Sequence, residues 1–286
     1  MWQSLTIDEY ADLERACGSV TVQYGGVWWR RVRPLLYRPL DPFQSTSCTA
    51  IRPHLGPLTS VQHHLADIES ANSYLNLLVF DQIKDYCIEN LRKHHRRYLR
   101  EALRNEIELK QISDVRNLPD ELHEVYLAFY QRSGYTFNKN RLKKSHFTNW
   151  INCHLSQPKT CVTIATHQNR PVGIYIACLL KDTLIWKTAV NSPDAVKLRV
   201  VDLILHHYHE QAKKQPEIKR IYCGYFSGDS GLDTFKLRRG ANICTLPSHL
   251  RILPWMLKLF KIVRPSVYRN LVGFSPEEIE SILSKQ

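Results

Sequence analysis

The sequence predicts a mixed α/β protein whose C-terminal part contains an antiparallel meander followed by a helix, a strand and a second helix. Three short runs, 161–165, 172–178 and 184–190, alternate small or β-branched residues on two faces, which is the period of strands. Breaks at Asn169-Arg170-Pro171 and Lys181-Asp182 separate these runs. After residue 196 the apolar positions repeat with the period of a helix. They are Val201, Ile204, Leu205, Tyr208 and Ala212.

The sequence pattern of the N-terminal part predicts a helix and three strands. An amphipathic helix is expected over 7–17, ended by Gly18. Strands are expected over 20–24 and 27–37, because Gly-Gly between two such runs is typical of a hairpin. A third strand is expected over 74–80.

A long helix is predicted over 81–105, with Asp81 as its N-cap. Five cations recur on one of its faces at the spacing i, i+3, i+4, i+7 and i+11. They are Lys93, Arg96, Arg97, Arg100 and Arg104. Two interpretations remain open. The stripe is either a solvated helix face or a surface that contacts phosphate groups.

The remaining elements follow from the same patterns. A strand over 106–112, a helix that follows Ser113 and has its apolar side over 118–129, and a helix over 147–155 precede the meander, and a strand over 218–223 follows the long helix. A short helix over 232–237 ends at Gly240, and a strand is expected over 243–252. The last helix begins at Ser275-Pro276-Glu277-Glu278, which has the composition of a capping box with proline at N1.

Residues 254–263 form one more helical pattern, for which two interpretations are open. Trp255, Met256, Leu259, Phe260 and Val263 are expected on one side, packed in the core. Alternatively, the nearby Lys258, Lys261 and Arg264 make the segment a basic amphipathic element that rests on a membrane or lines an acyl pocket.

The order of elements from about residue 105 to 250 resembles the GNAT acyltransferase fold. Leu91-Arg92-Lys93-His94-His95-Arg96-Arg97 before this unit, and Thr234-Phe235-Lys236 with Arg239-Gly240-Ala241 near its end, resemble the Fem-type branch. That branch carries two GNAT-like halves and includes peptidyl and acyl transferases. The resemblance implies an incomplete N-terminal half over 1–104 and an acyltransferase domain over 105–286.

The composition is that of a globular protein with a basic surface, but it does not identify the substrate. Hydrophobic residues make up 43% and charged residues 23% of the 286, which are ordinary globular values. The formal net charge of +12 favours anionic partners, such as a phosphorylated donor, nucleic acid or an acidic membrane face. Eight cysteines without a C-x-x-C pair predict buried thiols in a reducing compartment. With no signal-peptide pattern and no apolar run of about 20 residues, a cytoplasmic protein is expected, either free or peripheral to the membrane.

The resemblance places donor binding at the start of the helix that follows the meander. In GNAT enzymes the donor pyrophosphate lies on free backbone N–H groups there, where the helix dipole is positive. Here Lys197-Leu198-Arg199-Val200-Val201 lacks the usual glycines, so Lys197 and Arg199 are expected to compensate by charge. The predicted donor-binding residues are Asn191, Ser192, Lys197, Leu198, Arg199, Val200 and Lys236.

The same resemblance implies a tyrosine that protonates the leaving thiolate. Tyr225 is the nearest candidate and Asp229 is a second one, as a base acting through water. The three histidines His206, His207 and His209 have no metal-ligand partner pattern, and His206 and His209 are expected in solvent beside Asp202. No metal is predicted.

The resulting hypothesis is an N-acyltransferase that moves an acyl group from a CoA or carrier-protein thioester to an amine. Acyl-CoA is the expected donor substrate. Two alternatives remain. One is a Fem-type aminoacyl-tRNA-dependent transferase that contacts tRNA phosphates through the basic stripe. The other is a non-catalytic GNAT-like protein that binds nucleic acid or an anionic membrane.

Overall fold

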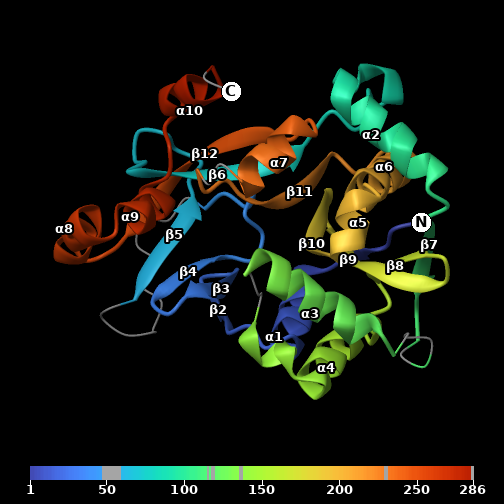
Figure 1. Cartoon of the computed structure of the whole chain (residues 1–286). Coiled ribbons are helices and arrows are strands. Elements are labelled where there is room, and N and C mark those ends of the chain that lie inside the picture. The colour runs from blue at the N-terminus through green and yellow to red at the C-terminus, as the bar shows by residue number, and fades with distance from the viewer. Residues whose placement is uncertain (47–58, 115, 117–119, 135–137, 229–230, 285–286) are drawn as a thin grey trace. The chain divides into compact units, whose positions relative to one another are not determined.

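The computed structural model describes residues 1–46, 59–114, 116, 120–134, 138–228 and 231–284 (Figure 1). The chain forms two compact units, and each is built from separate segments. The first contains Met1–Thr6, Phe80–Cys223 and Arg238–Gly240, and the second contains Ile7–Val79, Gly224–Leu237 and Ala241–Gln286. Both units therefore cross the sequence-based boundary at residue 104, and their identity as two GNAT-like halves stays a proposal.

The first unit contains the predicted meander, which is confirmed. Strands β8 (Thr160–His167), β9 (Arg170–Leu180) and β10 (Thr183–Asn191) pair antiparallel in sequence order. The other strands of this sheet are β7 (Glu108–Ile112) antiparallel to β8, β11 (Arg220–Tyr225) parallel to β10, and β1 (Ser4–Leu5) parallel to β9. Consecutive residues of β8 and β9 are buried, which indicates that both faces of the sheet are covered.

Helices pack on this sheet and on one another. Helix α3 (Leu122–Ser133) contacts β9 and β10, and α4 (Lys144–Leu155) contacts β8. The predicted helix after the meander is divided into α5 (Pro193–Lys197) and α6 (Val200–Lys213), and α6 contacts both β10 and α2 (Lys93–Arg104). Cys161, Cys178 and Cys223 are buried in strands, as predicted.

The prediction of one helix over 81–105 is wrong. Asp81 does not cap a helix, and α2 begins at Lys93 after a short 3₁₀ turn, Ile88–Asn90. Tyr86 explains the irregular path, because its ring stacks on His209 of α6 and its carbonyl accepts a hydrogen bond from Lys213 Nζ at 2.9 Å. These tertiary contacts hold residues 81–92 against α6 without the helical hydrogen-bond pattern.

The strands of the second unit pair in the order β2 (Thr21–Tyr24), β3 (Val27–Arg33), β4 (Leu36–Pro39), β5 (Ser60–His64), β12 (Asn242–Arg251), β6 (Ser73–Phe80). The Gly25-Gly26 hairpin is confirmed, with φ of 59° and 74° that suit glycine. The expected strand over 27–37 is two strands instead, because Pro34 has no N–H to donate and lies in the turn between them. The helices of this unit are α1 (Ile7–Ala16), α7 (Leu232–Arg238), α8 (Pro254–Val263), α9 (Pro265–Val272) and α10 (Pro276–Leu283).

Helix α10 has the predicted capping box. Ser275 Oγ accepts a hydrogen bond from the Glu278 backbone N–H, and the Glu278 carboxylate accepts one from the Ser275 backbone N–H. Among the described residues, no helix combines the length and the apolar composition that crossing a bilayer requires.

Candidate functional site

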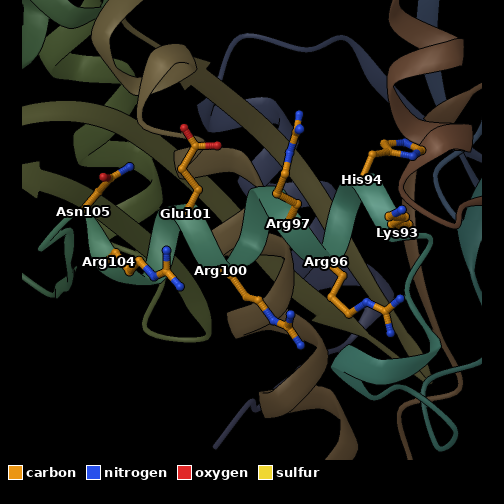
Figure 2. Close-up of a pocket in the computed structure, with 8 residues that line it drawn as sticks. All are labelled: Lys93, His94, Arg96, Arg97, Arg100, Glu101, Arg104 and Asn105. Carbon is orange, nitrogen blue, oxygen red and sulfur yellow. The ribbon is translucent and has the colours of Figure 1, made fainter.

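Helix α2 exposes its cations because its apolar residues face the other way. His95, Leu99 and Ala102 are buried, and α2 packs against α6. The predicted basic stripe is confirmed on the opposite side, where all five cations are exposed or partly exposed. Together with His94, Glu101 and Asn105, these cations line an open pocket of about 1010 Å³ (Figure 2). Since all eight lining residues lie on α2 or at its C-cap, Asn105, the pocket is an open face and not an enclosed cavity.

The cations project in two directions. Figure 2 shows the side chains of Arg96, Arg100 and Arg104 extending from the exposed face of α2 toward one edge, and those of Arg97 and Glu101 toward the opposite edge. The first three lie at i, i+4 and i+8, the spacing of neighbours along one helix row. A row of this kind presents planar guanidinium groups, which bind phosphate oxygens through paired N–H donors.

Few of these charges have a partner within the described chain. Arg96 Nη1 donates to the Glu89 carbonyl at 3.1 Å, and the Arg97 guanidinium lies over the Tyr98 ring. No carboxylate of the described residues forms an ion pair with Lys93, Arg100 or Arg104. The single carboxylate of the pocket, Glu101, lies 3.6 Å from Arg199 Nε. The α2 face therefore carries a net positive charge that is available to a polyanion.

The predicted donor loop, 191–200, is largely helical. Ser192 caps α5 by accepting from the Ala195 N–H at 3.1 Å, and Leu198 ends it. Val200 begins α6 and is fully buried. Asn191, at the end of β10, accepts hydrogen bonds from the Tyr175 hydroxyl and, through its carbonyl, from Arg132.

Both cations of that loop have intramolecular partners. Lys197 Nζ lies 3.3 Å from Asp194 Oδ1, and both side chains are exposed. Arg199 adopts a left-handed backbone with φ of 60°, where glycine is normally favoured. Its guanidinium lies 4.2 Å from the centre of the Tyr98 ring, beside Glu101. Arg199 thus joins the α2 face, which the sequence did not predict.

Strands β10 and β11 separate part-way along their length. Only residues 183–185 of β10 pair with 220–222 of β11, whereas β10 continues to Asn191. The β10–β9 register also shifts between Trp186 and Thr188. Trp186 itself is buried, donates to the Thr188 carbonyl at 3.1 Å and packs edge-on against Tyr208, so it belongs to the core. The later residues of β10 have no described strand partner on the β11 side.

A buried ion pair links α6 to the segment Arg239-Gly240-Ala241. Arg239 donates from Nε and Nη2 to the two carboxylate oxygens of Asp202 at 2.9 and 2.8 Å. His95 Nδ1 of α2 lies 3.7 Å from the same carboxylate. Burial alone would raise the pKa of Asp202, but His95 and Arg239 hold this pKa below its usual value. Asp202, Arg239 and His95 thus connect three segments that are far apart in sequence, and they lie on the buried side of α2.

The histidines of α6 are partly enclosed, and the prediction that His209 lies in solvent is wrong. His209 is buried, stacks on Tyr86 with ring centres 4.2 Å apart and donates from Nδ1 to the Leu205 carbonyl at 2.7 Å. His206 Nδ1 lies 3.0 Å from the Tyr86 hydroxyl. Within the described residues, no group of three or more His, Cys, Asp or Glu side chains is arranged to hold a metal ion.

We expect His209 to make stability depend on pH. Burial lowers the pKa of its imidazole from 6.5 to about 4. Between these two pH values the unfolded chain binds a proton that the folded chain does not. The free energy of unfolding therefore decreases as the pH is lowered from 6.5 to 4. The loss at pH 4 is roughly 3 kcal/mol at about 1.36 kcal/mol per pH unit. His209→Gln should remove this part of the loss in unfolding titrations at pH 7, 5.5 and 4, and the exposed His146→Gln control should not. Equal pH dependence in all three proteins would contradict the assignment.

The remaining predicted site residues lie in the second unit. Tyr225 ends β11, and the Arg38 guanidinium lies 4.3 Å from the centre of its ring. Arg38 is buried and donates from Nε to Gln62 Oε1 at 2.9 Å. Lys236, on α7, is partly buried, and its ammonium group lies beside Gly224. Asp229 falls outside the described residues.

No family model and no curated protein matches the sequence. Solved structures do match its fold. The C-terminal domain of a putative lysylphosphatidylglycerol synthetase from Agrobacterium fabrum aligns with a TM-score of 0.58 at 12% identity, covering 95% of this chain and 93% of that chain. L-PGS from Bacillus licheniformis aligns with a TM-score of 0.56 at 12% identity, over the same shares of the two chains. FemX aligns with a TM-score of 0.55 at 10% identity, covering 89% and 92%.

The chain has a GNAT-like fold. These matches extend over both compact units, so the similarity is not limited to the meander. At 10–12% identity they show the fold alone.

Proposed function

We propose that this protein is an aminoacyl transferase that takes its aminoacyl group from a charged tRNA and passes it to an amine. The observation that carries the proposal is the open cationic face of α2, in which Lys93, Arg100 and Arg104 have no carboxylate partner among the described residues. Two further facts support it. FemX and L-PGS are among the structures with the same fold, and the sequence resembles the Fem-type branch.

The extent of the face favours a large polyanion over a compact one. Arg104 lies eight positions after Arg96, which is about 12 Å along a helix at 1.5 Å per residue. Arg199 lies beside the same face, but Glu101 pairs with it, so the charge of the face comes from the cations of α2. A nucleic-acid backbone carries regularly spaced charges along such a length, whereas the phosphates of CoA form one compact group.

The reaction needs one bond exchange and two proton movements. The acceptor amine nitrogen forms an amide bond with the carbonyl carbon of the aminoacyl ester, and the bond from that carbon to the ribose oxygen breaks. The amine loses a proton, and the ribose oxygen gains one. A general acid near the leaving oxygen, for which Tyr225 is the candidate, would speed the second movement.

Acyl transfer from CoA to an amine is the second candidate. The end of the β10–β11 pairing at residue 185 of β10 favours it, because an extended ligand can hydrogen-bond to a strand beyond the point where its partner strand ends. The pairing of Lys197 with Asp194, and of Arg199 with Glu101, lowers the charge available for a diphosphate at the start of α6.

Binding measurements on the whole chain separate the two donors. With deacylated tRNA we expect tight binding whose log K falls with log[salt] at a slope of about −3.5 to −4.5, given five phosphate contacts at ~0.7–0.9 each. Calorimetry with acetyl-CoA and longer acyl-CoAs should show no binding. Tight acyl-CoA binding with a shallow salt dependence, and no salt-sensitive tRNA binding, would establish the second candidate. Transfer of neither group to any amine would support a non-catalytic protein.

Tyr225→Phe tests the proposed general acid. The change removes one hydroxyl and keeps the ring that Arg38 covers. We expect turnover to fall roughly 10²–10⁴-fold with donor affinity unchanged. Tyr222→Phe, in the same strand, is the matched control. Full activity of the Tyr225 variant would reject the assignment, and Asp229 would be tested next.

A further inference from the structure

Helix α8 exposes an apolar face. Trp255, Leu259, Ile262 and Val263 have 59%, 48%, 79% and 62% of their surface exposed. They lie at i, i+4, i+7 and i+8, which places them along one face of the helix. Large apolar side chains grouped in this way on a protein surface mark an interaction site.

This face is not required to hold α8 in place. Leu257 and Phe260, on another side of the helix, pack against the buried cluster of Leu36, Leu250 and Leu271. The predicted single apolar side of 254–263 is therefore wrong, because Phe260 faces the core while Trp255, Leu259 and Val263 face outward. The core anchors α8 and leaves its second apolar face without a described partner.

The charges around the face have one sign. Residues 241–276 contain no Asp or Glu and five cations, Arg251, Lys258, Lys261, Arg264 and Arg269. Arg269 is neutralised by Glu278, at 2.5 Å. Lys258, Lys261 and Arg264 are exposed and form no ion pair with a described carboxylate. Lys258 lies four positions before Ile262, along the edge of the apolar face. Lys261 lies over the Tyr268 ring at 5.7 Å, which leaves its charge unneutralised.

We propose that α8 binds the surface of an anionic phospholipid bilayer, with its exposed apolar face among the upper acyl chains and its cations at the lipid phosphates. Apolar side chains flanked only by Lys and Arg are complementary to this interface, and long basic side chains reach the headgroups while their stems stay apolar. A tryptophan at the start of the face suits the same boundary. The ten residues of α8, about 15 Å long, lie on the bilayer and do not cross it. This surface belongs to the second unit and does not depend on the identity of the donor.

Flotation of the whole chain with vesicles tests the proposal. With equimolar phosphatidylcholine and phosphatidylglycerol we expect binding that weakens as salt is added, and with phosphatidylcholine alone we expect little. Leu259→Ser combined with Ile262→Ser should lower the partition coefficient by ~10–1000-fold, since each exposed side chain contributes part of a full apolar transfer. Ile68→Ser, which changes an apolar side chain that is 72% exposed outside α8, is the matched control and should leave binding unchanged.

Two further measurements separate charge from apolar contact. Lys258→Gln with Lys261→Gln should weaken binding to the anionic vesicles by roughly tenfold or more, at about 1 kcal/mol per cation. Quenching of tryptophan fluorescence by brominated lipids should be lost in Trp255→Phe. Thermal unfolding without vesicles verifies that each variant is folded, which is expected because the changed side chains are exposed. Vesicle binding that none of these variants alters would overturn the proposal. The proposal would also be overturned if the chain bound no vesicles but formed dimers that the Leu259 and Ile262 changes dissociate. The apolar face would then bind a second copy of the chain.

Discussion

Replacing Arg97 and Arg100 by Glu is expected to abolish tRNA binding while leaving the protein folded. Each change removes a phosphate contact and adds repulsion, so affinity at moderate salt should fall by at least ~100-fold, and the salt slope should shrink by about 2. The fold should survive, because both side chains are exposed and their only recorded contact within the described chain is that of Arg97 with the Tyr98 ring.

The control must change the net charge equally. Lys143→Glu with Lys144→Glu does so at two exposed positions at the start of α4. Filter binding or fluorescence titration at several salt concentrations should show a small uniform weakening in this control and loss of binding in the α2 variant. Unchanged affinity and slope in the α2 variant would mean that the stripe is an ordinary solvated face.

Replacing Arg239 by Met is expected to lower the unfolding free energy by about 3–5 kcal/mol, the typical cost of removing one partner of a buried ion pair. The Asp202 carboxylate is buried and receives two hydrogen bonds from Arg239, so the variant leaves a buried charge with only His95 nearby. Denaturant unfolding at pH 7 measures the change.

A second substitution distinguishes the ion pair from simple packing. Asp202→Asn combined with Arg239→Met should be more stable than Arg239→Met alone, because no unpaired charge remains buried. Exposed Arg238→Met, at the neighbouring position, should change stability by less than about 0.5 kcal/mol. A loss below about 1 kcal/mol in the Arg239 variant, or purely additive effects, would show that the pair is not the main support of α2.

Much of the secondary structure was predictable, because its causes are local. The meander follows from alternation, the β2–β3 hairpin from Gly25-Gly26, and the start of α10 from Ser275 and Glu278. Strand β5 and helix α9 were not predicted. The segment 81–92 also looked helical, yet contacts of Tyr86 with His209 and Lys213 hold it in another conformation.

The candidate site was predictable only in part. The cations of α2 are visible as a helical repeat within twelve residues, and the structure keeps them on one exposed side. The pairing of Asp202 with Arg239 joins positions 37 apart, and His95 approaches from a third segment. No periodicity relates such residues, since tertiary packing alone brings them together. The left-handed backbone of Arg199 was also hidden, because glycine is the usual signal for that conformation.

The sequence alone determined which residues share a face of a helix, since that depends on 3.6 residues per turn. Tertiary structure decided whether each face meets protein or solvent. On α6 the face of His209 and Asp202 appeared polar and exposed, but α2 and Tyr86 cover it. On α8 apolar residues appeared to form one core face, but Leu257 and Phe260 alone contact the cluster of Leu250 and Leu271. Burial depends on which distant segments pack against a helix, and that information is not contained in the period of the helix itself.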